Sequence, residues 1–198
     1  MPPKQDMDLI KSKKDRFEGL RSRRFNFENH WQEVADHVSP ADAYFTTQRS
    51  PGEKLRSQQY DSTAELSLKR ATSFYDSITT PRNKKWHGLR SNNADLNRLQ
   101  AVREWFDEAT DTLFQKRYGP RSGYPGQRQQ QIHSLWAFGT APMYIDMLGT
   151  NLRYHAVHLS EFYMDENFAG IIDTVYREIP MTTRQMIQQF GEDNVPSG

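Results

Sequence analysis

The spacing of apolar residues changes once along this chain, near Ala141, and that change constrains the fold more than any other feature. Before it, apolar residues recur at steps of three, four or seven, which places them on one face of a helix. After it, short runs rich in β-branched and aromatic residues are separated by turn residues, as in antiparallel strands. The sequence therefore predicts an α+β fold, in which N-terminal helices are followed by a small antiparallel sheet and a last helix.

The helices before Ala141 can be placed by their apolar stripes and end signals. Ser62 and Glu65 have the spacing of a capping box at the start of the second helix. The first helix is either continuous or broken near Asn26. Residues 41–59 contain few apolar side chains and are predicted to form a loop. Residues 119–126 are rich in glycine and proline and are predicted to form a mobile connection between the third and fourth helices. The predicted helices cover residues 6–38, residues 61 or 62 to 80, residues 94–118 and residues 127–138.

The strands after Ala141 are short and lie close together in sequence. The loop at residues 166–170 contains Gly170 and has the length of a hairpin turn. Thr182 or Thr183 is expected to cap the last helix, over residues 184–190, which Gly191 ends. The predicted strands cover residues 142–148, 152–159, 161–165 and 171–179.

Composition excludes several classes of protein. Among 198 residues there is no cysteine, so disulfides, thiol catalysis and cysteine-based zinc sites are excluded. No apolar run approaches the ~20 residues that cross a bilayer, and no signal peptide or membrane partner is expected. The mean hydropathy is −0.90, yet the chain has 11 Phe, 9 Tyr and 4 Trp. We expect part of this aromatic surface to be buried against partners.

The net charge of +1 hides an asymmetry between the two halves. Residues 1–100 hold 18 basic and 13 acidic side chains, a net charge of +5, whereas residues 101–198 hold 8 and 12, a net charge of −4. Such a split is typical of nucleic-acid binding, of an acidic partner, or of copies that dock head to tail.

Catalytic and metal-binding signals are weak. The chain contains no GxSxG, P-loop or HExxH motif, and no enzymatic activity or cofactor is expected. An accessory metal-dependent enzyme is kept as a rival hypothesis, with Asp165, Asp173 and a histidine as ligands. The other residues considered for such sites are His30, His37, His155, His158 and Glu166.

Two basic clusters are candidate contacts with phosphates or with another subunit. The first lies around the first helix, and the second precedes Trp86, whose ring either stacks on a base or anchors the edge of a core. A non-specific nucleic-acid-binding protein that uses both clusters is the alternative function. The candidate contact residues are Lys13, Arg16, Arg21 and Arg24, within a cluster that runs from Lys11 to Arg24, and Arg82, Lys84 and Lys85.

Several local motifs, taken in order, resemble one known family. The order resembles the N-terminal region of the head-to-tail connector, or portal protein, of short-tailed bacteriophages, from about residue 20 to residue 191. The motifs are Arg24 with Trp31 and Val34 before Ser39-Pro40, Asp61-Ser62-Thr63 with Ser77-Ile78-Thr79-Thr80-Pro81 and Trp86, Phe138-Gly139-Thr140-Ala141, and residues 165–178 (DENFAGIIDTVYRE) followed by Met181-Thr182-Thr183-Arg184-Gln185 and Phe190-Gly191.

This resemblance implies a structural role. Portal proteins form a ring, usually of twelve copies, at one capsid vertex, where DNA enters and leaves. The implied partners are other copies of the chain, the major capsid protein, tail or adaptor proteins, the terminase during packaging, and double-stranded DNA bound without sequence preference. The implied location is the head-tail junction of the virion, and the host cytoplasm during assembly.

The resemblance also implies a division of the chain. Residues 1–60 are expected to form an N-terminal helical arm and loop, and residues 61–198 a wing-like α+β domain. Portal proteins are usually several hundred residues long, so the chain is expected to stop before the stem and clip regions.

Overall fold

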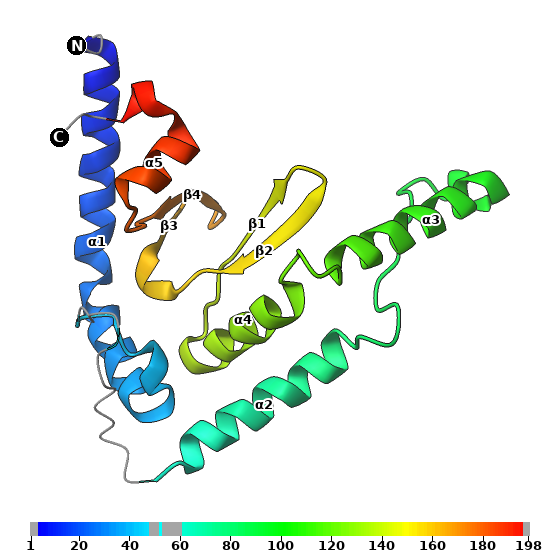
Figure 1. Cartoon of the computed structure of the whole chain (residues 1–198), viewed down its shortest axis with the longest axis horizontal. Coiled ribbons are helices and arrows are strands. Elements are labelled where there is room, and N and C mark those ends of the chain that lie inside the picture. The colour runs from blue at the N-terminus through cyan, green and yellow to red at the C-terminus, as the bar shows by residue number, and fades with distance from the viewer. Residues whose placement is uncertain (1–3, 48–51, 53–60, 196–198) are drawn as a thin grey trace. The chain divides into compact units, whose positions relative to one another are not determined.

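The computed structural model describes residues 4–47, 52 and 61–195, and it confirms the α+β class (Figure 1). Each predicted helix and strand is present, with shifted ends. The helices are α1 (Lys4–Val38), α2 (Thr63–Thr79), α3 (Gln100–Arg117), α4 (Tyr124–Phe138) and α5 (Thr183–Phe190), and the strands are β1 (Met143–Leu148), β2 (Asn151–Ala156), β3 (Phe162–Glu166) and β4 (Ile172–Arg177).

The chain divides into two compact units. The central unit consists of residues 23–160, and the terminal unit of residues 1–22 together with residues 161–198. Both units take part of α1, which is continuous through residue 26, so the alternative of a break near Asn26 is wrong. The domain boundary predicted at residue 60 lies outside the described residues and stays a prediction.

The core of the central unit lies where α4 packs between α2 and β2. Ile132 of α4 is fully buried, and Leu68 of α2 and Tyr154 of β2 are nearly so. Figure 1 shows α2 and α4 side by side, as the contacts between them require. The other buried apolar residues of this unit are Ala35, Ala43, Tyr124, Ala156, Val157 and Leu159.

The turn in this part of the chain covers residues 119–123, whereas residues 124–126 belong to α4, so the predicted connection is shorter than the sequence indicated. Ser122 and Tyr124 are buried, and the hydroxyl of Ser122 donates a hydrogen bond to the carbonyl of Gly119 over 2.9 Å. Gly123 has φ +66°, a left-handed conformation that a residue with a Cβ adopts only with strain. This turn lets α4 begin at Tyr124 rather than at residue 127, with Pro125 in its first turn.

The four strands form two separate hairpins rather than one sheet. In the described residues, β1 pairs only with β2 and β3 only with β4, both antiparallel. Gly149, with φ +63°, forms the turn of the first hairpin together with Thr150. In the terminal unit, the rings of Tyr163 and Tyr176 pack against Phe17 of α1, 4.8 and 5.8 Å between centroids.

Of the two helix caps predicted from the sequence, the one at α5 forms and the one at α2 does not. Thr182 caps α5 in a full capping box with Gln185, which confirms that prediction. Ser62 makes no such contact at α2, because Glu65 pairs instead with Lys69 one turn later. The carboxylate of Asp61 accepts a hydrogen bond from the N–H of Thr63, 3.1 Å away, and the pKa of Asp61 is lowered by its bonds to Thr63.

No helix in the described part of the chain has both the length and the apolar character needed to cross a bilayer.

Candidate subunit and nucleic-acid interface

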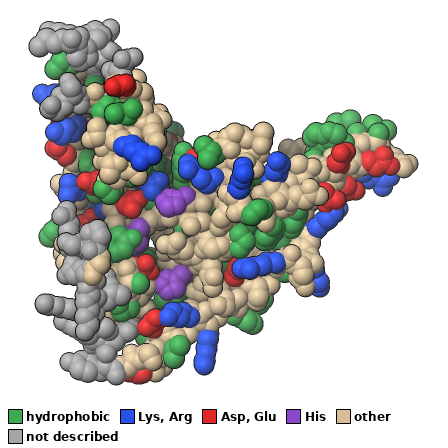
Figure 2. Space-filling view, in the orientation of Figure 1, with side chains coloured by type: hydrophobic (Ala, Val, Ile, Leu, Met, Phe, Trp, Pro, Cys, Tyr) green, Lys and Arg blue, Asp and Glu red, His purple; other side chains and the backbone are tan. Residues whose placement is uncertain are grey.

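The basic side chains of α1 fall into two groups according to what surrounds them. Lys11, Lys13 and Arg21 are exposed, and Lys14 is exposed with Glu18 3.9 Å away. Figure 2 shows Lys and Arg side chains in blue along α1. An exposed row of cations on a helix attracts phosphates or an acidic surface through long-range electrostatics. These side chains are therefore accessible for the predicted contacts with phosphates or with another subunit.

Arg16 and Arg24 have partners within the chain. The guanidinium of Arg16 lies 3.1 Å from the carboxylate of Asp165 in the terminal unit. Arg24 is 11% exposed, and its Nε and Nη2 donate to the carboxylate of Glu28 over 2.8 and 2.6 Å. Its Nη1 and Nη2 also donate to the carbonyls of Leu159 and Ser160, 3.0 and 2.8 Å away. Arg24 therefore fixes α1 to the segment after β2.

The second basic cluster lies between α2 and α3. Arg82 and Lys84 are exposed, whereas Lys85 forms an ion pair with Asp111 of α3. Arg82 also lines a shallow pocket with residues of α2 and α4. Lys85 is nevertheless 59% exposed, so all three cations of this cluster face solvent.

Trp86 is an anchor of the central unit. Its Nε1–H donates to the hydroxyl of Tyr118 over 3.0 Å, and the guanidinium of Arg117 lies 4.8 Å from its ring centroid. Phe114 packs against its edge. The pKa of the adjacent His87 is lowered, mainly by burial and to a smaller extent by the positive charge of Arg117. Of the two interpretations of Trp86, the packed edge of a core is the one the contacts favour.

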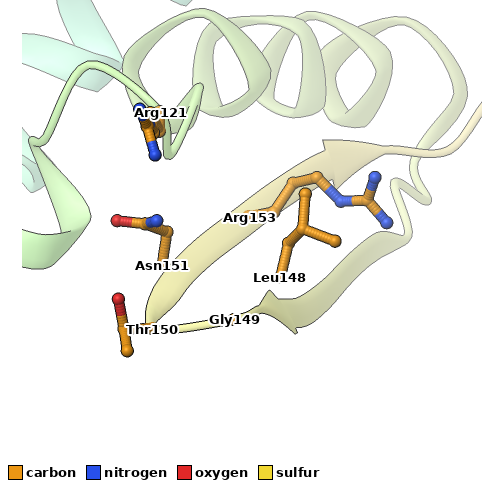
Figure 3. A pocket seen from close by; sticks show the side chains of 6 residues that line it. All are labelled: Arg121, Leu148, Gly149, Thr150, Asn151 and Arg153. Atoms are coloured by element: carbon orange, nitrogen blue, oxygen red, sulfur yellow. The ribbon is translucent and has the colours of Figure 1, made fainter.

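A pocket of about 530 Å³ lies beside the turn of the β1–β2 hairpin (Figure 3). In Figure 3 the side chains of Arg121, Thr150 and Asn151 border one side of it. Arg153 forms an ion pair with Asp146, and its hydrogen bond lowers the pKa of Asp146. The lining offers donors to an anion and contains no carboxylate or histidine.

The residues considered as metal ligands are engaged in other contacts or exposed to solvent. Asp165 pairs with Arg16, and the exposed Asp173 accepts a hydrogen bond from Thr174. His158 is buried, with Tyr44 stacked on its ring, whereas His155 is exposed. Among the described residues, no three His, Cys, Asp or Glu side chains come together as a metal site.

Several elements carry large apolar side chains at the surface, which the sequence predicts only in general terms. On α2, Phe74 is 69% exposed and Ile78 63%. On β1, Met147 and Leu148 are each about two-thirds exposed. Figure 2 also shows hydrophobic side chains in green over part of α3, whose Trp105 is 62% exposed. Large exposed apolar patches mark surfaces that bind other proteins.

Comparison with known proteins gives one consistent result. The chain is 27% identical over 181 residues to the "Probable portal protein" of Bordetella phage BPP-1, which covers 88% of this chain and 31% of that protein. It is 26% identical over 182 residues to the "Portal protein" of Salmonella phage epsilon15, which covers 89% of this chain and 32% of that protein. The chain thus spans about a third of the length of these relatives.

The model of a protein family, described as bacteriophage head to tail connecting protein, matches residues 11–198. That range contains every strand, four whole helices and most of α1. The chain therefore belongs to the bacteriophage head to tail connecting protein family.

Proposed function

We propose that this chain is part of a portal subunit, a structural protein whose ring joins the phage head to the tail and through which DNA is packaged and ejected. The observation that carries the proposal is the family match over residues 11–198. The exposed apolar side chains on α2, α3 and β1 support it, because a ring subunit must bury two lateral faces against its neighbours. A separate nucleic-acid-binding protein is not supported by the comparisons.

We assign residues 1–60 to an N-terminal arm and residues 61–198 to the wing-like part of the subunit. The ring is proposed to contain twelve copies and to sit at one capsid vertex. Its further partners are the major capsid protein, tail or adaptor proteins and, during packaging, the terminase. The subunit assembles in the host cytoplasm, and the energy for packaging comes from a separate ATPase rather than from this chain.

Sedimentation velocity of the full-length natural protein tests the assembly. The proposal predicts one large, discrete species whose formation depends on protein concentration. Screening by salt weakens attraction between oppositely charged surfaces, so its stability should change with ionic strength. A monomer at every concentration and every salt concentration contradicts the proposal.

DNA contact is proposed to be electrostatic and independent of sequence. Four of the exposed cations, Lys13, Arg21, Arg82 and Lys84, supply it. Each substitution to Ala that removes a cation from a phosphate makes the negative slope of log affinity against log salt shallower by roughly 0.9. Titrations of duplex DNA at several salt concentrations measure this slope for the ring. Selective binding of one sequence, or no change on substituting all four residues, contradicts the proposal.

A further inference from the structure

Strand β1 has an outer edge that no described residue covers. The outer edge of its partner β2 is occupied, because the N–H of Tyr154 donates to the carbonyl of Ser122 over 3.0 Å and the N–H of Ala156 to the side chain of Gln127 over 2.7 Å. In an antiparallel pair, alternate residues direct their backbone groups toward and away from the partner strand. Tyr154 is opposite Ile145 in the register. The N–H and C=O of Ile145 therefore point away from β2, on the open side of β1.

The side chains on this strand are also exposed and apolar. Ile145 is 54% exposed, Met147 66% and Leu148 67%. Native proteins usually protect such an edge with a lysine, a proline, a bulge or a covering element. Strand β1 has no Lys or Pro, its register with β2 has no bulge, and Asp146, its one charged residue, is paired with Arg153. An unprotected apolar edge of this kind accepts a further strand.

The terminal unit has a second open edge, on β4. The N–H of Glu178 donates to the carbonyl of Glu161 over 2.9 Å, which places Glu178 and, by alternation, Tyr176 on the side that faces β3. The backbone groups of Val175 consequently point outward, and no described residue bonds to them. The side chain of Val175 is 53% exposed.

The two units that carry these edges have opposite charge. Residues 23–160, which contain β1, hold 18 basic and 14 acidic side chains, a net charge of +4. Residues 1–22 and 161–198, which contain β4, hold 8 and 11, a net charge of −3. Opposite charges favour contact between the central unit of one copy and the terminal unit of another, and oppose pairing between like units.

We propose that the outer edge of β1 in one copy pairs with the outer edge of β4 in a neighbouring copy, so that two hairpins join into one four-stranded sheet across the subunit boundary. The contact uses two different surfaces and is therefore heterologous, as closure of a ring requires. The inference rests on the ring assembly proposed above, and it names the strands that make the lateral contact.

The first test exploits the direction of the Ile145 N–H. Proline is tolerated in an edge strand where its missing N–H would face solvent, so Ile145→Pro keeps the β1–β2 ladder and removes a donor from the open edge. Ile145→Thr is the matched control, since it keeps the N–H and the β-branched shape but removes apolar surface. We expect Ile145→Pro to raise the protein concentration needed for half-assembly of the full-length ring by about tenfold or more, the equivalent of one lost hydrogen bond and its disrupted neighbours. Ile145→Thr should have a smaller effect.

The second test uses the absence of cysteine from the chain, and it decides the matter if the proline variant does not fold. Ile145→Cys and Val175→Cys are made in separate preparations, mixed, assembled into rings and treated with a short bis-maleimide. Only a contact between copies can link two single-cysteine chains. Dimers should form in the mixture and not in either preparation alone. Gln115→Cys, exposed on α3, replaces Ile145→Cys in a control mixture and should give no dimer above background.

The outcomes separate this inference from the proposed function. If the unaltered protein forms no ring, the proposed function fails and this inference fails with it. If rings form but Ile145→Pro assembles at the unaltered concentration, or the mixture gives no dimer, the proposed function stands and the β1–β4 contact is wrong. A dimer from Ile145→Cys alone also overturns it, because it shows β1 paired with β1.

Discussion

Arg24 is expected to stabilise the fold, which separates it from the other basic residues of α1. Replacing it with Met keeps an unbranched aliphatic stem of similar helix propensity and removes the hydrogen bonds to Glu28 and to the carbonyls of Leu159 and Ser160. It also leaves the carboxylate of Glu28, 16% exposed, without this cation. Breaking a buried pair by removing one partner costs about 3–5 kcal/mol, and partial exposure of both groups lowers that to about 2–4 kcal/mol.

Urea denaturation of the purified chain, followed by circular dichroism, measures this loss. In a thermal scan of the same samples, at roughly 2–4 °C for each kcal/mol in a chain of this length, the melting temperature should fall by about 4–16 °C. Arg21→Met is the matched control, because Arg21 lies on the same helix and is exposed, and its change should stay within about 0.5 kcal/mol. Glu28→Gln, added to Arg24→Met, removes the unpaired carboxylate and should recover part of the loss. Equal stability of Arg24→Met and Arg21→Met would refute the reasoning.

Three further predictions concern the central unit. Ile132→Ala, at a fully buried position, should lower the free energy of unfolding by about 2–5 kcal/mol, and a loss below about 1 kcal/mol by urea titration contradicts the assigned core. Gly123→Ala should destabilise the chain by about 1–2 kcal/mol because φ is +66° there. Gly126→Ala is the control and should not destabilise it, because Gly126 lies in the first turns of α4 with open space around it. Equal melting temperatures of the two variants contradict this. The pKa of His87 is lowered in the folded chain, so the unfolded chain binds more protons and stability should fall as pH drops below the ordinary value of 6.5. Melting temperatures of His87→Gln between pH 7 and pH 5 should fall less steeply than those of the unaltered chain, and parallel curves contradict the assignment.

The period of the apolar residues was sufficient to predict the elements and the fold class. The helix stripes and the short strand runs of residues 142–179 correspond to elements of the structure, because local spacing decides which face each residue occupies. Thr182 and Gln185 likewise signalled a capping box that forms. Contacts that the sequence pattern does not show determine the other details, such as which partner a side chain pairs with. Glu65 had the spacing of a capping box but pairs with Lys69, a competing contact of similar strength.

The candidate contact residues show the same limit more clearly. Arg24 and Arg21 are alike in sequence, yet Arg24 meets the carbonyls of residues more than 130 positions away. Lys85 meets Asp111 in the same way. The open edge of β1 depends on where the turn at Ser122 meets β2. No local pattern indicates such contacts. The sequence therefore identifies the basic residues but not which of them form contacts within the chain.

Negative-stain electron microscopy of the full-length natural protein tests the central claim most directly. We expect closed rings with a central channel, built from a fixed number of identical subunits, and we expect Ile145→Pro to lower the number of intact rings. Particles of the full-length protein that are single subunits or closed two-fold dimers, with no central channel under any assembly condition, would contradict it.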